Sequence, residues 1–342
     1  MTIVIFVPRK GSQVQRIVRR LEQRGAEYRV LPLSRPDRWN LSLRPQDEDG
    51  RSSLGKGRDR VSLDQIKAFL GPALSVDVRR TGWTEESQRF AAQEWVSTLW
   101  SLYLLTRSRL WVNPLEAYLL YESKPFQNRV ARNVGFLVPD SLVTTDPSEV
   151  RRFFSGRPGG AALKRVSHPP RIEFDPRPAP SSRVLFTTRL TLSDLTPRRL
   201  ANVPDCPVHL QEYVEKATEV RSYVVGQRVL SIEILSQDVE ETREDWRRYP
   251  TRRIRGRLVV DPQRWKCRQF DLPSPMVRRC LLLSQRLQMR YAAIDMIRRP
   301  DGRFVFLEAN ASGAFGFAED LAGLPLSRAL ADLLMEAERA AG

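Results

Sequence analysis

The chain has 342 residues, 41% of them hydrophobic, and its 56 basic and 40 acidic residues give a formal net charge of +16. This length allows two or three domains with buried cores, and the apolar fraction excludes a wholly disordered chain. The cysteines Cys206, Cys267 and Cys280 have no C-x-x-C spacing, which excludes a disulfide scaffold, a zinc knuckle and a redox pair. There is no signal peptide and no apolar run near about 18 residues, so we expect a soluble, cytoplasmic protein without membrane contact.

The positive charge comes almost entirely from arginine, because only seven of the basic residues are lysines. Such an excess fits nucleic acid, a nucleotide or an acidic peptide, and it also fits a coding bias toward arginine. The basic residues are spread along the chain and do not form a tail or a single basic helix. Charge alone therefore leaves these alternatives open, and the motifs must choose among them.

The first 112 residues predict an α/β domain. An apolar run at 1–7, an amphipathic stretch at 13–24 and a second strand at 27–31 make a β-α-β opening. The polar segment 44–60 predicts an exposed loop, and 75–79 a further strand. Apolar residues at helical spacing predict a long helix over 85–106, whose aromatic residues we assign to the core.

The remaining residues predict a small central domain at 113–207 and a C-terminal domain at 208–342. In the central domain, Pro114 can open a short helix, and Pro125 a second that ends near Val134 with Gly135 as its C-cap. Short strand candidates at 161–166, 183–188 and 209–214 alternate with proline clusters. From residue 219 onward, closely spaced candidates at 220–225, 229–235 and 253–260 favour antiparallel pairing, and 292–298 with 303–307 predict a hairpin. Helices are expected at 276–289 and 325–340.

Three oxygen-bearing side chains stand on the hairpin predicted around Pro300-Asp-Gly302. Glu308 and Asn310 share one face of a strand because they are two residues apart, and Asp295 can face them across the ladder. Such a set suits Mg²⁺, which takes carboxylates together with nucleotide phosphate oxygens. The alternative is a surface hairpin with an incidental pair of acids.

Two lysines form a second group. Lys124 precedes Pro125 at the start of a predicted helix, and Lys164 lies inside the apolar run 161–166. Burying a lysine is costly unless an anion meets it, and a nucleotide phosphate is such an anion. The alternative is an edge strand whose lysine reaches the solvent.

A third segment, His209-Leu-Gln-Glu-Tyr-Val214, could present backbone donors and acceptors to an adenine edge. It is followed by Glu219 and Arg221, which share a strand face and could address metal and phosphate.

The order of these residues resembles the ATP-grasp superfamily, and more closely the microviridin-type peptide ligases, also called graspetide synthetases. The resemblance is good from about residue 111 onward. The similar segments are Trp111-Val-Asn-Pro114, Glu122-Ser-Lys-Pro-Phe-Gln-Asn-Arg-Val-Ala-Arg132, Gly135-Phe-Leu-Val-Pro139, Leu142-Val-Thr-Thr-Asp-Pro147, Leu185-Phe-Thr-Thr-Arg189, Ser236-Gln237, Asp245-Trp-Arg247, Phe306-Leu-Glu-Ala-Asn-Ala-Ser-Gly313 and Gly323-Leu-Pro-Leu326.

The resemblance implies an α/β (α+β) ATP-grasp fold with an N-terminal pre-ATP-grasp domain, a central domain with a lid loop and a C-terminal antiparallel-sheet domain. It also implies ATP and Mg²⁺ as cofactors. The implied roles are phosphate binding by Lys124 and Lys164, adenine binding by Glu212, Tyr213 and Val214, further nucleotide contact by Glu219, stabilisation of the transferring phosphoryl group by Arg221, a substrate-carboxylate contact by Arg247, and Mg²⁺ binding by Asp295, Glu308 and Asn310.

The activity implied is ligation: Asp or Glu side chains of a ribosomally made precursor peptide become acyl phosphates and are joined to Ser or Thr hydroxyls or Lys amines. The partner is a peptide with a leader and an acidic core, which suits a basic enzyme and disfavours nucleic acid. Family members are often dimers, so the resemblance is compatible with a homodimer, while the sequence itself leaves the oligomeric state open. Alternatives are a carboxylate–amine ligase for a small molecule or a protein C-terminus, and a non-catalytic binding protein.

Two departures from the family pattern stand out. The lid segment 165–182, normally glycine-rich, contains no glycine and five prolines. The Asn-Pro that usually follows the metal-binding glutamate is Asn310-Ala311 here.

Overall fold

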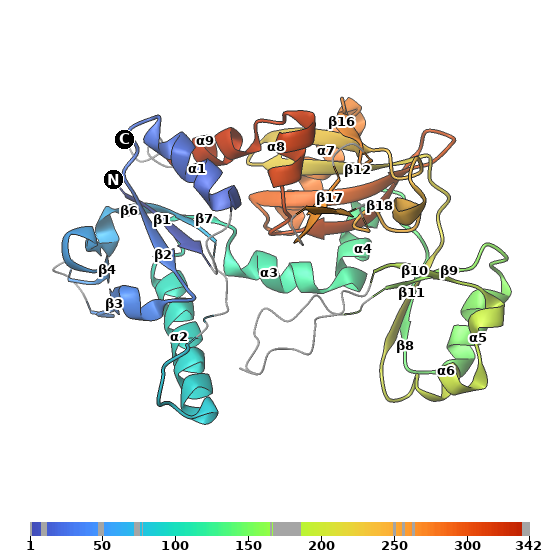
Figure 1. Cartoon of the computed structure of the whole chain (residues 1–342), viewed down its shortest axis with the longest axis horizontal. Coiled ribbons are helices and arrows are strands. Elements are labelled where there is room, and N and C mark those ends of the chain that lie inside the picture. Colours follow the sequence, from blue (N-terminus) through green and yellow to red (C-terminus); the bar gives the residue numbers. More distant parts are fainter. Residues whose placement is uncertain are drawn as a thin grey trace.

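The computed structural model describes residues 2–7, 12–46, 51–71, 76, 78–164, 166, 186–248, 251–254, 257–261 and 264–336. The lid segment 165–182 therefore lies outside the described residues, apart from Val166. Figure 1 shows the N-terminal domain on one side of the molecule and the C-terminal and central sheets on the other, with helix α3 running between them.

The N-terminal domain has the α/β architecture expected from its opening. A four-stranded parallel sheet has the order β2-β1-β6-β7, and a small antiparallel sheet has the order β3-β4-β5. The elements are β1 (Thr2–Val7), α1 (Ser12–Glu22), β2 (Tyr28–Pro32), β3 (Asn40–Ser42), β4 (Ser53–Gly55), β5 (Val61–Ser62), β6 (Ile66–Leu70), α2 (Glu85–Leu105) and β7 (Leu110–Val112).

Two predictions in this domain need correction. The exposed loop predicted at 44–60 is wrong over β4, where Leu54 is fully buried against Trp39 and Val61. The strand predicted at 75–79 lies partly outside the described residues, and its described positions are not in a strand. The sheet uses β6 instead, a strand whose apolar run is interrupted by Lys67, so its pattern is hidden in the sequence.

The central domain is an antiparallel sheet with the order β10-β9-β11-β8 and short helices on one side. Its N-terminal helices begin near the predicted prolines, although Pro114 is the N-cap of α3 and lies just before its first turn. The elements are α3 (Leu115–Glu122), α4 (Lys124–Asn133), β8 (Ser141–Thr144), α5 (Pro147–Ser155), β9 (Ala161–Lys164), β10 (Thr188–Leu190), α6 (Pro197–Ala201) and β11 (Val208–Glu212).

The C-terminal domain is built on an antiparallel five-stranded sheet, as predicted, with the order β16-β13-β12-β17-β18. The single strand predicted at 253–260 is a hairpin of β14 and β15, and the helix α8 was not predicted. The elements are β12 (Thr218–Val225), β13 (Arg228–Ile234), β14 (Thr251–Ile254), β15 (Arg257–Val260), β16 (Cys267–Gln269), α7 (Ser274–Arg286), β17 (Tyr291–Arg298), β18 (Phe304–Asn310), α8 (Gly316–Ala322) and α9 (Leu326–Glu336).

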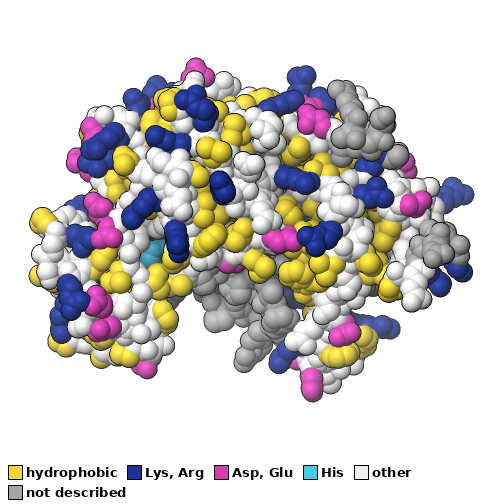
Figure 2. All heavy atoms as spheres, turned by 180° about the vertical axis from the view of Figure 1, so that it is seen from behind, with side chains coloured by type: hydrophobic (Ala, Val, Ile, Leu, Met, Phe, Trp, Pro, Cys, Tyr) yellow, Lys and Arg dark blue, Asp and Glu magenta, His cyan; other side chains and the backbone are white. Residues whose placement is uncertain are grey.

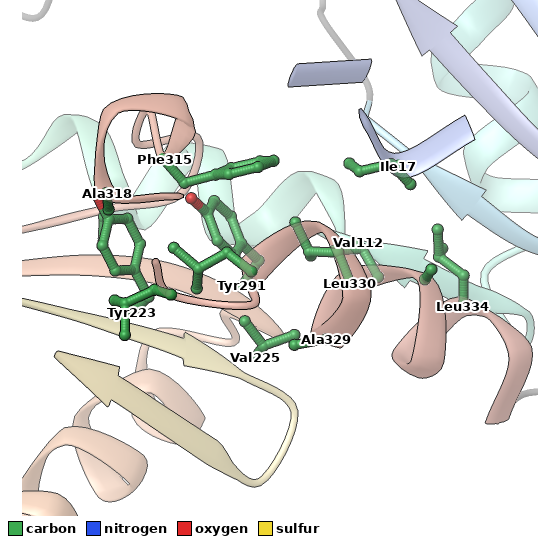
Figure 3. Packing of buried hydrophobic residues seen from close by; sticks show 14 of the residues in the cluster. Ile17, Val112, Tyr223, Val225, Tyr291, Phe315, Ala318, Ala329, Leu330 and Leu334 are labelled. Carbon is green, nitrogen blue, oxygen red and sulfur yellow. The ribbon is translucent and has the colours of Figure 1, made fainter. Parts of the chain in front are cut away.

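Both faces of the five-stranded sheet are buried. Helices α3, α4 and α7 cover one face, and α8 and α9 cover the other. On the second face the core continues into the N-terminal domain, where Ile17 of α1 and Val112 of β7 approach Leu330 and Leu334 of α9 (Figure 3). The N-terminal domain is thus fixed to the C-terminal sheet through a continuous apolar core.

A single buried amide joins the end of β7 to the start of β17. The Asn113 side chain donates to the carbonyls of Tyr291 and Ala311, each at 2.7 Å, and accepts from the N–H groups of Arg290 at 2.7 Å and Tyr291 at 2.8 Å. These four bonds use the full capacity of the amide. They hold the first residue of the central domain against the strand that carries Asp295.

Basic side chains are scattered among hydrophobic ones over the face shown in Figure 2, without a continuous basic stripe there. Within the part of the chain that the structure describes, no helix is long and apolar enough to cross a membrane.

Candidate functional site

A cavity of about 250 Å³ opens where the central sheet meets the C-terminal sheet. It is lined by β9 and β11, by the start of α4, by the chain between β11 and β12, and by the ends of β17 and β18. All but one of the predicted site residues line it, namely Lys124, Lys164, Glu212, Tyr213, Val214, Glu219, Arg247, Asp295, Glu308 and Asn310. The exception, Arg221, lies against Asp295.

The acidic group has the geometry that the hairpin predicts. Asp295 and Glu308 are paired in the β17–β18 register, with an irregularity directly after Asp295. The Asn310 amide nitrogen lies 3.4 Å from Asp295 Oδ2 and 3.3 Å from Glu308 Oε1. The three side chains therefore converge on one point, and the alternative of a surface hairpin with an incidental acid pair is wrong, because Asp295 is only 7% exposed.

Electrostatics around Asp295 favour a cation at this point. Its Oδ1 is buried and accepts no hydrogen bond from the described residues. Burial raises the pKa of Asp295 to about 7, against the opposing effect of Arg221 and with a further increase from Glu308. A divalent cation would supply positive charge that stabilises the ionised form of Asp295. A rotated Asn310 amide would offer that cation a third oxygen.

The described residues contain no group of three or more His, Cys, Asp or Glu side chains that could hold a metal. With one oxygen from each, two carboxylates and an amide would fill half of the six positions that Mg²⁺ prefers and leave the other half to other ligands. This donor set fits Mg²⁺ bound jointly by the protein and by phosphate oxygens or water.

Arg221 is a buried cation next to these acids. It stands opposite Asp295 in the β12–β17 ladder, and its Nε lies 3.5 Å from Asp295 Oδ1. Its guanidinium carbon is 5.1 Å from the centre of the Trp246 ring, within the range of a cation–π contact. Gly313 leaves room for it, because a Cβ there would come within 2.9 Å of Arg221 Nη2.

The two predicted lysines approach the acids from the central domain. Lys124 Nζ lies 3.6 Å from Glu308 Oε2. Gln127, one turn further along α4, donates to the Tyr121 carbonyl at 2.6 Å and accepts from the Ala309 N–H at 2.7 Å. This buried amide fixes α4 beside β18 and so holds Lys124 near Glu308.

Lys164 ends β9, which lies between β10 and β11, so the alternative of an edge strand is wrong. Burial lowers the pKa of Lys164 to about 8, although Glu308 acts in the opposite direction; Lys124 and Arg247 lower it further. Because burial disfavours the charged form of Lys164, an anionic ligand in the cavity would stabilise that form.

The segment predicted to meet adenine leaves the end of β11. Glu212 accepts from the Asp140 N–H at 3.3 Å and donates its own N–H to the Asp140 carbonyl at 2.8 Å. The Arg189 guanidinium stacks on the Tyr213 ring at 4.3 Å. Among the described residues, the Val214 N–H donates to no carbonyl. The backbone between the two sheets is therefore held in place at Glu212, and the Val214 N–H is available to a ligand.

Sequence reasoning missed Lys216, although the scarcity of lysine could have pointed to it. Lys216 Nζ donates to Glu219 Oε1 at 2.7 Å and to the Glu244 carbonyl at 3.0 Å. Both side chains are buried, with 5% and 7% exposed for the lysine and the glutamate. Burial raises the pKa of Glu219, while Lys216 opposes that rise.

Asp245 was also missed as a site residue in its own right, and it holds Arg247. The Arg247 Nε and Nη2 donate to Asp245 at 2.8 and 2.6 Å, a bidentate contact. Burial alone would raise the pKa of Asp245, but Arg247 and the Thr187 N–H at 2.9 Å lower it below its usual value. Arg247 is predicted to contact a substrate carboxylate, but in this structure it already binds the carboxylate of Asp245. Its side chain is still 44% exposed.

No known family model and no curated protein matches the sequence. Solved structures do match over nearly the full length. The macrocyclase MdnC bound with precursor peptide MdnA, from Microcystis aeruginosa MRC, is 24% identical, with 98% of this chain and 99% of that chain covered and a TM-score of 0.80.

A RiPP-associated ATP-grasp ligase from Chryseobacterium gregarium, in complex with ADP and a leader and core peptide, is 23% identical over 98% of this chain and 96% of that one, with a TM-score of 0.77. The ATP-grasp ligase PsnB complexed with minimal precursor is 25% identical over 98% of each chain, with a TM-score of 0.73. The chain therefore has the ATP-grasp fold, as its sequence motifs imply.

Proposed function

We propose that this protein is an ATP- and Mg²⁺-dependent ligase that activates Asp or Glu side chains of a ribosomally made precursor peptide as acyl phosphates. It then joins them to Ser or Thr hydroxyls or to Lys amines, which closes macrocyclic esters or amides. The observation that carries the proposal is the convergence of Lys124, Lys164 and the acidic group of β17–β18 in one cavity. The likeness of the whole chain to peptide-bound macrocyclases supports the same reading.

The described residues divide the work of phosphoryl transfer between them. Lys124 and Lys164 hold phosphate oxygens, and the backbone at Val214 meets the adenine edge. Asp295, Glu308 and Asn310 hold the metal ion, which when bound neutralises charge on the phosphates. Arg221 stabilises the negative charge that develops as the γ-phosphoryl group moves to the substrate carboxylate and ADP leaves.

The second half of the reaction needs a positioned acyl phosphate. A hydroxyl or amine attacks the acyl carbon, the carbon–oxygen bond to phosphate breaks, and phosphate leaves with the nucleophile's proton released to solvent or a base. Arg247, held by Asp245 with part of its guanidinium exposed, can orient the substrate carboxylate or the developing oxyanion. Its orientation is fixed before substrate arrives, so little entropy is lost on binding.

The peptide partner is expected to be acidic in its core, because the net charge of +16 steers anionic ligands toward the protein. Its leader is expected on the central domain, near α5 and the residues up to Gly160; of the segment beyond, to 180, only 161–164 and 166 are among the described residues. We expect the enzyme to act in the cytoplasm, and a homodimer stays a prediction.

The test mixes the protein with ATP, Mg²⁺ and the precursor peptide encoded beside its gene, and follows the peptide by mass spectrometry. We expect a loss of one water per bond formed, with ADP and phosphate released. Asp295→Asn and Glu308→Gln should abolish the mass loss, whereas Asp301→Asn, in the exposed hairpin turn, should leave it unchanged. Turnover of ATP without any mass loss would indicate a different carboxylate–amine ligase, and no nucleotide binding at all would indicate a binding protein.

A further inference from the structure

A second cavity, of about 790 Å³, lies at the opposite end of strand β12 from the first. Its walls are the end of α2, the start of α3, the β12–β13 turn at Gly226, and the outer face of α7. Glu219 and Gly226 are seven positions apart along β12 and its end, or about 23 Å at the usual rise per strand residue. The two cavities are therefore distinct.

Three arginines line this second cavity, and they come from different parts of the chain. Arg107 follows α2, Arg278 lies on α7, and Arg290 precedes β17. Within the described part of the chain, their guanidinium groups form no ion pair and no hydrogen bond. By contrast, Arg303 is paired with Asp301, and Arg268 and Arg298 are both paired with Glu233.

The position of Arg290 is fixed by its backbone. Its N–H donates to Asn113 Oδ1 at 2.7 Å, and its carbonyl accepts from the Gly226 N–H at 2.9 Å. Partial burial lowers the pKa of Arg290, although the residue stays exposed at the surface, and no carboxylate of the described residues offsets this effect. An anionic ligand would offset this cost.

The one acidic residue of the lining is already engaged. The Tyr103 hydroxyl donates to the Glu116 carboxylate, and burial together with this contact raises the pKa of Tyr103 to about 12.

The rim of the cavity is apolar. Leu281, Leu282 and Met289 line it, and Leu282 is 45% exposed. Residues 278, 281, 282 and 285 share one face of α7 because they are three, four and seven positions apart. Charged donors thus alternate with apolar side chains, as in a surface that takes a peptide rather than a free ion.

We propose that this second cavity binds an acidic peptide segment that carries apolar side chains. Carboxylates of the segment pair with Arg107, Arg278 and Arg290, and the leucines of α7 contact its apolar side chains. This binding needs neither nucleotide nor catalysis, so it stands independently of the ligase activity.

The experiment measures fluorescence anisotropy of a short fluorescein-labelled peptide of alternating glutamate and leucine, with saturating ATP and Mg²⁺ present. The double variant R107Q/R278Q should weaken binding by about a hundredfold, because a charged hydrogen bond contributes about a factor of ten. The matched control R38Q/R58Q removes the same charge from exposed positions of the N-terminal domain and should leave affinity within about twofold.

The proposal is overturned if no binding is seen, if the control pair weakens binding as much as R107Q/R278Q does, or if inorganic phosphate displaces the peptide at equal concentration, which would indicate a small-oxyanion site.

Discussion

Gly313 offers the sharpest test of how the site is held open. A Cβ at this position would lie 2.3 Å from the Cβ of Ala293 and 2.9 Å from Arg221 Nη2. Carbon atoms that are not bonded to each other pack at about 3.5–4.0 Å. In Gly313→Ala the segment must therefore move by about 1.2 Å or more, since Ala293 is fixed in the middle of β17.

That movement has a defined cost. The Tyr291 hydroxyl donates to the Gly313 carbonyl at 2.5 Å, and the Tyr223 hydroxyl to the Ala314 carbonyl at 3.0 Å. Overpacking and the loss of these bonds should lower the free energy of unfolding by about 1–3 kcal/mol. Displacement of Arg221 should lower kcat by about tenfold to a hundredfold, because transition-state contacts depend on positions to within about 1 Å.

The assays are urea unfolding and the rate of phosphate release with the peptide substrate. Gly156→Ala is the matched control, since a Cβ there meets nothing within 4 Å, and it should change stability by less than about 0.5 kcal/mol. Ala293→Gly removes the atom nearest to the added methyl group, so the double variant should show a coupling of about 1 kcal/mol in favour of folding. If Gly313→Ala changes neither stability nor kcat, the reasoning about Arg221 is refuted.

Three further predictions follow from other contacts. Asn113→Ala should lower the free energy of unfolding by about 3–5 kcal/mol in urea unfolding, because it leaves buried groups of Arg290, Tyr291 and Ala311 unpaired; a change below about 1 kcal/mol would contradict this. Lys164, whose pKa is about 8 against an ordinary 10.5, should lose its charge as pH rises through 8, so ATP affinity by calorimetry should fall between pH 7 and 9.5, and less so in Lys164→Arg. The contribution of Lys164 to stability has the opposite sign: the penalty for burying its charge is present below pH 8 and disappears toward 10.5. Asp245→Asn should lower kcat/KM for the peptide by about tenfold as Arg247 loses its bidentate partner, whereas exposed Asp238→Asn should have no effect.

The hairpin of β17 and β18 is the part of the site that the sequence determined most completely. Alternation of apolar residues and the turn at Pro300-Asp-Gly302 are local signals, and they define which side chains share a face. Asp295, Glu308 and Asn310 could therefore be placed together from local pattern alone, and their convergence follows the predicted register.

Other partners could not be found in this way, because they come from segments distant in the chain. Asp245 binds Arg247 but also the Thr187 N–H, 58 residues earlier. Strand β6 was missed because Lys67 interrupts its short apolar run, and Leu54 lies in a segment whose composition is that of a loop. Such elements are stabilised by tertiary burial, which overrides local propensity.

The sequence by itself therefore determined the kinds of chemistry present: scarce lysines in apolar surroundings, paired carboxylates on one strand face, and an excess of arginine. Only the tertiary structure decided which of these groups meet. Lys164 and Glu308 are brought to one cavity by the packing of two sheets, and Arg107, Arg278 and Arg290 to another by segments of different domains. The physical reason is that periodicity defines the face on which a side chain lies, whereas the distance between faces depends on how the whole core packs.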